Sequence, residues 1–200
     1  IFHDEFISRS PEGDGRARLL KIAADAYRLT GNFPQASESL EDALTNAEDD
    51  LQTFRVLETK GTMLAQTSRF EEAMALFTSL TMDYRERVSA EDLARTATVR
   101  GPLLFITGQR NEAFELLEHA KETFINLGEI ATAIRILNNM GSFLGISGEH
   151  EAALEALLES LEYQEKFGIQ QYLISTINEI GTESMLLGKW KDALYHFKHG

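Results

Sequence analysis

Apolar residues recur along most of the chain at the spacing of an α-helix, and the predicted helices come in pairs. Leu57, Gly61 and Leu64 fall on one side of one predicted helix, and Ala73 and Phe77 fall on one side of the next. Spacings of three, four and seven residues place side chains on one face of an α-helix. No stretch alternates apolar and polar residues with a period of two, so the sequence predicts an all-α protein.

The pattern of small residues repeats every 40 positions. Gly61, Gly101, Gly141 and Gly181 are 40 residues apart. Later positions follow the same period, namely a second glycine (Gly108, Gly148, Gly188) and an alanine (Ala73, Ala113, Ala153, Ala193). A fixed period of this length is typical of solenoids, in which each unit packs only on its neighbours. A small residue inside a helix lets a second helix cross closely.

The period divides the chain into an array that covers residues 16–200. We expect units at about 16–49, 50–89, 90–129, 130–169 and 170–200, with the last one truncated, and an N-terminal segment or the end of a preceding repeat at 1–15. The chain opens at Ile1 without a methionine and stops at Gly200 inside a repeat. We therefore expect it to be a piece of a longer protein.

These features resemble the tetratricopeptide repeat. The residues that carry the resemblance are Leu57, Gly61, Leu64, Ala73 and Phe77, and likewise Leu137, Gly141, Leu144, Ala153 and Leu157. HEAT and armadillo repeats have a similar length, but their Gly and Ala positions fit less well. The 40-residue variety is similar to that of Pins-type adaptors, kinesin light chains and bacterial peptide-pheromone receptors. The resemblance implies a right-handed superhelical solenoid of antiparallel helix pairs that binds proteins or peptides.

Composition excludes several other classes of function. The net charge of −13 argues against nucleic acid and anionic membranes as partners. No run of 18 apolar residues and no signal-peptide pattern is present, and we expect a cytoplasmic protein. The absence of cysteine excludes disulfides and thiol chemistry. His196 and His199 lack a third ligand nearby, so we expect no metal or other cofactor. No catalytic set stands out, so we expect no enzyme here, although the full-length protein is free to carry a catalytic domain elsewhere.

A second periodic set consists of arginines. Arg18, Arg55, Arg95 and Arg135 each lie two residues before the leading apolar position of the first helix of a unit. Such a set predicts a basic wall along the concave groove, and the guanidinium fork suits the carboxylates of an acidic, extended peptide segment. The resemblance to Pins-type adaptors implies that these arginines bind a ligand in a similar way. The alternative is pairing within the scaffold, because Asp14 and Glu91 stand four residues before Arg18 and Arg95.

Two asparagines follow the arginine positions by three residues. Asn138 and Asn178 lie almost one helical turn further along, and we expect them to face the groove. An amide offers both a donor and an acceptor to a peptide backbone. The alternative is a hydrogen bond between helices of the scaffold.

Two local features concern helix geometry. Ser68 and Glu71 have the spacing of a capping box at the start of a helix. Pro102 falls inside another predicted helix, either as a kink that reshapes the groove or as a tolerated defect beside Gly101.

The sequence as a whole predicts a peptide-binding or protein-binding scaffold without catalytic activity. We expect it to be the sensor or docking arm of a larger signalling or regulatory protein. The alternative is assembly, including a homodimer, because Trp190, Leu194 and Phe197 lie in a terminal repeat whose apolar face needs a neighbour.

Overall fold

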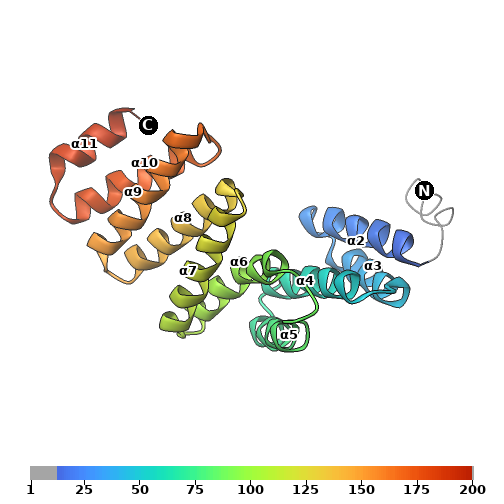
Figure 1. Ribbon diagram of the computed structural model, residues 1–200. Helices are drawn as coiled ribbons and strands as arrows, with labels where there is room; N and C mark the ends of the chain where they lie inside the picture. Colours follow the sequence, from blue (N-terminus) through green and yellow to red (C-terminus); the bar gives the residue numbers. More distant parts are fainter. Residues whose placement is uncertain (1–12, 200) are drawn as a thin grey trace. The chain divides into compact units, whose positions relative to one another are not determined.

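The computed structural model describes residues 13–199, and these form ten α-helices without a strand. The helices run in five consecutive pairs, coloured from blue to red along the chain (Figure 1). Their bounds are Asp14–Leu29 (α2), Phe33–Asn46 (α3), Asp50–Gln66 (α4), Phe70–Asp83 (α5), Ala90–Ile106 (α6), Arg110–Asn126 (α7), Ile130–Ile146 (α8), His150–Phe167 (α9), Leu173–Leu186 (α10) and Trp190–His199 (α11). The all-helical repeat architecture that the sequence predicts is confirmed.

We call the first helix of each pair the A helix (α2, α4, α6, α8, α10) and the second the B helix (α3, α5, α7, α9, α11). Within the pairs, α2 packs on α3, α4 on α5, α8 on α9 and α10 on α11. Phe105 of α6 meets Phe114 of α7 edge to face, with ring centroids 6.4 Å apart. The chain divides into two compact units after Leu103, and each is described separately below. The predicted N-terminal segment, 1–15, lies largely outside the described residues.

The glycines of the A helices are required by close packing against the B helices. A Cβ atom at Gly61 would lie 2.7 Å from Cζ of Phe77, and one at Gly141 would lie 2.7 Å from Cγ of Leu157. Real Cβ atoms do not approach other carbons so closely, so any larger side chain would push the two helices apart. A Cβ atom at Gly181 would meet Phe197 in the same way, so these three glycines mark the crossing points of their helix pairs.

The predicted capping box at Ser68 is wrong. Helix α5 begins after Arg69, and no side chain caps its N-terminus. Ser68 has a φ of 60°, a left-handed conformation that suits glycine, and Gly108 and Gly148 hold the equivalent positions of later repeats with φ of 86° and 81°. The turn between the A and B helices therefore requires a positive φ at this position. Ser68 adopts this conformation at a cost in backbone strain, which the glycines of later repeats avoid.

Pro102 lies inside α6, which runs without interruption from Ala90 to Ile106. The helix therefore accommodates the proline that the sequence places there, and no break in the element results.

Candidate functional site

Each A helix presents one face away from its B helix, and we call this the A face. On α8, Gly141 points to Leu157 of α9. At about 100° per residue, Arg135 points about 120° away from that direction and Asn139 about 160° away. Both are half-buried. Arg135 and Asn139 thus lie on the A face of α8, and a groove wall formed by all four arginines stays a prediction.

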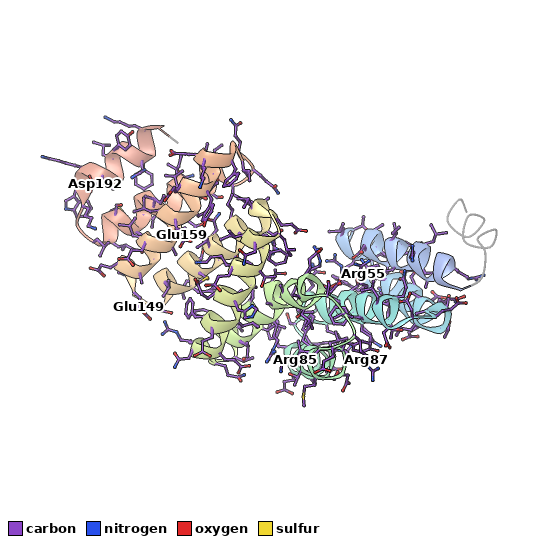
Figure 2. All side chains as sticks on the ribbon, viewed as in Figure 1. Arg55, Arg85, Arg87, Glu149, Glu159 and Asp192 are labelled. Carbon is purple, nitrogen blue, oxygen red and sulfur yellow. The ribbon has the colours of Figure 1, made fainter. Side chains whose placement is uncertain are left out.

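Arg55 is held by an acid of the next A helix. Its Nε and Nη2 atoms donate to Oδ1 of Asp92 at 3.2 and 3.1 Å. Asp92 is only 5% exposed, and its Oδ2 accepts from the Ser89 hydroxyl at 2.5 Å, while its backbone N–H donates to the same hydroxyl. Arg55, which is labelled in Figure 2, therefore joins α4 to the start of α6. Its side chain stays 47% exposed.

The remaining arginines differ in their surroundings. Arg95 pairs with Glu91 at 2.5 Å, the pairing at four residues that the sequence left open. Arg18 is exposed on α2; the side chain of Asp14 lies outside the described part of the chain, so their pairing stays a prediction. Arg135 forms no hydrogen bond or ion pair with any side chain that the structure describes.

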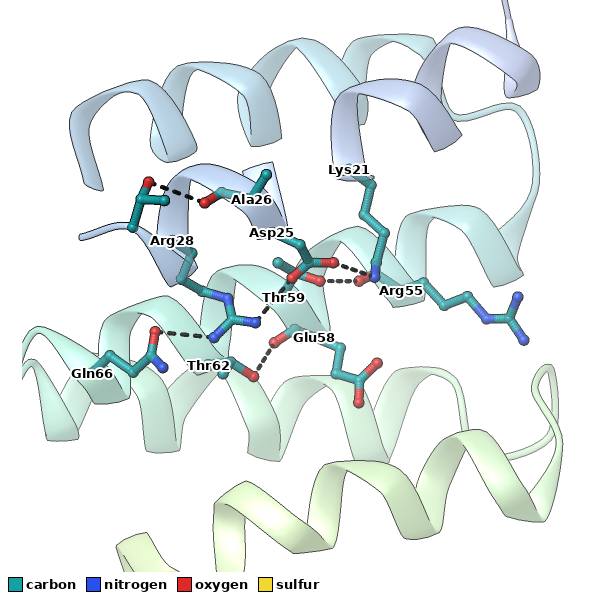
Figure 3. A network of polar contacts seen from close by, with 10 residues as sticks. Lys21, Asp25, Ala26, Arg28, Arg55, Glu58, Thr59, Thr62 and Gln66 are labelled. Atoms are coloured by element: carbon teal, nitrogen blue, oxygen red, sulfur yellow. Dashed lines mark hydrogen bonds and ion pairs between the residues drawn. The ribbon is translucent and has the colours of Figure 1, made fainter. Parts of the chain in front are cut away.

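A polar network joins α2 to α4 on the first unit. Asp25 accepts from Lys21 at 2.8 Å and from Arg28 at 3.0 Å, and Arg28 also donates to Gln66 of α4 at 3.1 Å (Figure 3). The cations on this part of the A face are thus already bound to acids or amides. Their charge is partly neutralised before any ligand arrives.

Glu58 is the carboxylate that this network leaves out. It is half-buried on α4, and Figure 3 shows no dashed line to its carboxyl group. Burial is the main reason why the pKa of Glu58 is raised to about 7. The nearby positive charges of Arg95, Lys21 and Arg55 lower this pKa in part. The negative charge of Asp92 raises the pKa further. At neutral pH the carboxyl group is therefore about half protonated.

Sequence reasoning missed Glu58, although a signal was present. Glu58 stands 80 residues before Asn138, at the same position of the repeat. Around Asn138 the structure supplies the polar partners Ser160 and Gln164. The equivalent positions in the earlier repeat are Leu80 and Tyr84, so α5 offers Glu58 an apolar residue where α9 offers Asn138 a hydroxyl.

Asn138 is bonded within the scaffold. Its amide nitrogen donates to the Thr176 hydroxyl at 3.0 Å, and its oxygen accepts from the hydroxyls of Ser160 at 2.6 Å and Thr176 at 3.2 Å. Gln164, which is buried, donates to both hydroxyls. The network ties α8, α9 and α10 together. This is the helix-to-helix bonding that the sequence left as the alternative to peptide contact.

Asn178 has the opposite environment, because its side chain is exposed on α10. Its backbone oxygen accepts from the Thr182 hydroxyl at 2.9 Å, and no described side chain bonds to its amide. The two asparagines that share a repeat position therefore differ in availability.

Metal binding and membrane crossing are two other roles that the described part of the chain could serve. No group of three His, Asp or Glu side chains there is arranged to hold a metal ion. Every helix from α2 to α11 is too short or too polar to cross a bilayer.

One stretch of the chain matches a known protein family. Residues 134–167 match the family model for the tetratricopeptide repeat, which describes a repeat unit and not an enzyme. No curated protein matches the sequence.

Several solved structures share the fold. BtubC (BKLC) from P. vanneervenii is 17% identical, with a TM-score of 0.81 over 90% of this chain and 78% of its own. The TPR-like repeats of a putative kinesin light chain from Podospora anserina are 16% identical, with a TM-score of 0.74 over 92% of each chain. A Rap protein in complex with the competence and sporulation factor is 15% identical, with a TM-score of 0.77 over 99% of this chain and 56% of its own.

These identities establish the fold alone. Residues 134–167 match a tetratricopeptide repeat unit, and the helix pairs that the structure describes have the fold of solved structures with TPR-like repeats.

Proposed function

We propose that the chain is a protein-interaction scaffold that binds an acidic, extended segment of a partner protein on its A face. The observation that carries the proposal is Arg135, a half-buried cation of the A face that no described side chain pairs. Holding an unpaired guanidinium at a partly desolvated position costs free energy, and a ligand carboxylate would recover it through a bidentate hydrogen bond. The complex of the similar Rap protein with a bound factor supports this kind of role.

The arginines contribute to this binding to different extents. In the second unit the primary contact is Arg135, which no described side chain pairs, and in the first unit it is Arg18, which is exposed. Arg55 uses only its Nε and Nη2 atoms on Asp92, so its remaining donors stay free for a ligand. Arg95 keeps 42% of its side chain exposed beside Glu91. Asn178 supplies an amide to the ligand backbone.

We leave Asn138 out of the proposed contacts. Its amide already makes three hydrogen bonds within the scaffold, and a ligand would have to break them. The role that we propose for this scaffold is that of a sensor or docking arm in signalling or regulation.

The test is selection of displayed peptides on the purified chain, followed by affinity measurement at two salt concentrations. We expect the selected peptides to be enriched in Asp and Glu and to bind less tightly at high salt. Binding should fall at least about tenfold in the double variant Arg18→Glu and Arg135→Glu. The matched control is the double variant Arg85→Glu and Arg87→Glu, the same charge change at two exposed residues of the α5–α6 connection (Figure 2). A selection without acidic enrichment, or an equal loss in the control, contradicts the proposal.

The second candidate is self-association through α11. Trp190, Leu194, Tyr195 and Phe197 are exposed by 66, 54, 60 and 47%. Leu154 holds the position equivalent to Leu194 in the preceding repeat, and there it is buried against Ile180 of the next A helix. Sedimentation equilibrium over a wide concentration range tests this candidate. A mass that doubles with concentration, and returns to that of the monomer in Leu194→Glu, supports it, and a constant monomer mass contradicts it.

A further inference from the structure

Helix α2 has a second apolar side besides the one that packs on α3. Its residues follow one another at spacings of three and four, which places side chains in a line along a helix: Leu19, Ile22, Ala26 and Leu29. Ile22 and Leu29 are 63 and 75% exposed, and Leu19 is half-buried. We call these four residues the head stripe. Because burying apolar side chains is favourable, the stripe indicates a surface that contacts another element.

The next A helix shows what covers such a stripe. The first two helix pairs are offset by 37 residues, so the head stripe up to Ala26 corresponds to three residues of α4, namely Val56, Thr59 and Met63. All three are buried. Val56 and Met63 belong to a core that includes Leu40 of α3. The preceding helix pair therefore covers this side of α4, whereas α2 has no preceding pair among the described residues.

The covering surface comes from three positions of the preceding pair. In the second unit α8 and α9 receive α10 through two polar contacts and one apolar contact. The Ser142 hydroxyl donates to Glu179 at 2.7 Å, and His150 pairs with Glu183 at 2.8 Å. Leu154 is buried against α10. An A helix is thus received by one residue of the preceding A helix and by two residues of the preceding B helix.

The last helix pair leaves the same three positions exposed. Forty residues further on, they are occupied by Thr182 of α10 and by Trp190 and Leu194 of α11. All three side chains are exposed, Trp190 by 66% and Leu194 by 54%. We call these three residues the tail face. Two different helix pairs therefore carry the two halves of a contact that the repeats make within the chain.

The head stripe and the tail face are complementary in size. The offsets of the internal contacts pair the two surfaces residue by residue: Ile22 with Thr182, Ala26 with Trp190, and Ala23 with Leu194. The large side chains of the tail face thus meet alanines, which leave room for them. Large residues facing small ones are what a close-packed junction between helices needs.

Charge favours the same pairing. Helix α2 carries four basic and two acidic side chains, although the whole chain has a net charge of −13. Helix α10 carries Glu179 and Glu183 and no basic residue. A second copy of the chain therefore offers α2 a surface of opposite charge, and this attraction orients the two copies head to tail.

We propose that the head stripe of one copy binds the tail face of a second copy, so that the repeat stacking continues from one molecule into the next. The contact rests on the second candidate function, self-association through α11, and gives α11 a partner other than a second α11. Because the two surfaces differ, every dimer keeps one free head stripe and one free tail face. Assembly therefore grows beyond the dimer, unless the copies close into a ring.

Two variants of the full chain, each with one surface blocked by a charge, test the proposal. Ile22→Glu blocks the head stripe, and Leu194→Glu blocks the tail face. Each variant alone should stay monomeric at concentrations at which the parent associates. An equimolar mixture should form a dimer, because each variant keeps the surface that the other needs. In analytical ultracentrifugation we expect this mixed contact to be at least about tenfold tighter than the self-association of either variant.

The matched controls introduce the same charge at exposed apolar residues outside both surfaces. They are Met82→Glu on α5 and Leu158→Glu on α9, at side chains that are 74 and 43% exposed. Both should associate as the parent does. Circular dichroism establishes that all four variants remain helical.

The outcomes separate the contact from the function on which it rests. A dimer in the mixture, with each variant monomeric alone, supports the head-to-tail contact. If Ile22→Glu still associates and Leu194→Glu does not, self-association through α11 stands and the head-to-tail contact is wrong. A monomeric mixture, or an equal loss of association in the controls, also overturns the contact. If the parent is monomeric at every concentration, both the contact and self-association are wrong.

Discussion

Glu58 makes the stability of the first unit depend on pH in a way that one substitution can isolate. Its pKa is raised from 4.5 to about 7 by burial. Between these two values the folded protein binds more protons than the unfolded chain, so stability falls as pH rises. The contribution is fully present below pH 4.5 and is lost as pH rises through 7. Replacing Glu58 by Gln removes the ionisable group and keeps the shape of the side chain.

The size of the effect follows from the shift. A change of about 2.5 pKa units, at about 1.4 kcal/mol per unit, corresponds to about 3 to 4 kcal/mol. This value is an upper bound, because Glu58 is half-buried and water reaches part of it. We therefore expect Glu58→Gln to be more stable than the parent by up to about 3 kcal/mol at pH 8. Near pH 4 both carry a neutral group, so the difference should be close to zero.

Urea unfolding followed by circular dichroism at several pH values between 4 and 8 measures this difference. Comparing the variant with the parent at each pH cancels the titration of all other carboxyl groups. The control is Glu155→Gln, at an exposed position of α9, which should show no pH-dependent gain. A difference between Glu58→Gln and the parent that stays constant from pH 4 to 8 would refute the assigned burial of the Glu58 carboxyl group.

Other predictions concern packing and the asparagines. Gly141→Ala should destabilise the chain by about 1–3 kcal/mol, because the added Cβ would lie 2.7 Å from Leu157. Thermal unfolding measures this loss of stability, and an unchanged melting temperature would contradict the close helix crossing. Asn138→Ala should cost about 1–3 kcal/mol, since it leaves buried hydroxyls without their partner, whereas Asn178→Ala should change stability by less than about 0.5 kcal/mol. Equal losses in urea unfolding for the two asparagine variants would rule out this distinction.

The repeat architecture was predictable because its cause is local in sequence. A close helix crossing needs a small residue, and Gly61, Gly141 and Gly181 each mark one such crossing whatever the rest of the unit contains. The turn residue was less predictable: the hydroxyl of Ser68 suggested a cap, but the turn demanded a positive φ. Serine occurs both as a helix cap and in turns, so the identity of Ser68 alone does not decide between the two roles. Gly108 and Gly148, at the same repeat position, indicate a turn with a positive φ.

The side-chain partners were harder to predict, for a geometric reason. Asn138 was expected to share the face of Arg135. Three residues turn a helix by about 300°, so the side chains of Arg135 and Asn138 point about 60° apart. This difference is enough to direct the Asn138 amide toward α10. Arg55 has no acid four residues before it, yet it is bound by Asp92, which is 37 residues later. Contacts between successive A helices follow the repeat length and are invisible to rules that compare residues within one helix.

Three exposed aliphatic residues at the ends of A helices show that some of this information was accessible. Ile106, Ile146 and Leu186 obey the same 40-residue period as the glycines. Nothing in the sequence distinguishes an exposed aliphatic residue from a buried one, so the period identified the position but not its exposure. The structure supplies that difference.

The hydrogen-bonded layer around Asn138 also determines the order in which the repeats stack. At the junction of α8, α9 and α10 the four equivalent positions are Asn138, Ser160, Gln164 and Thr176, whereas one repeat earlier they are Thr98, Ala120, Phe124 and Ile136. A folding error that shifted the stack by one unit would place an amide against a phenylalanine and leave its hydrogen bonds unmade. Because neighbouring repeats share the same glycine period, packing alone would permit such a slip. The polar layer makes the misaligned stack unfavourable, so this array, although periodic in sequence, has units that are not interchangeable.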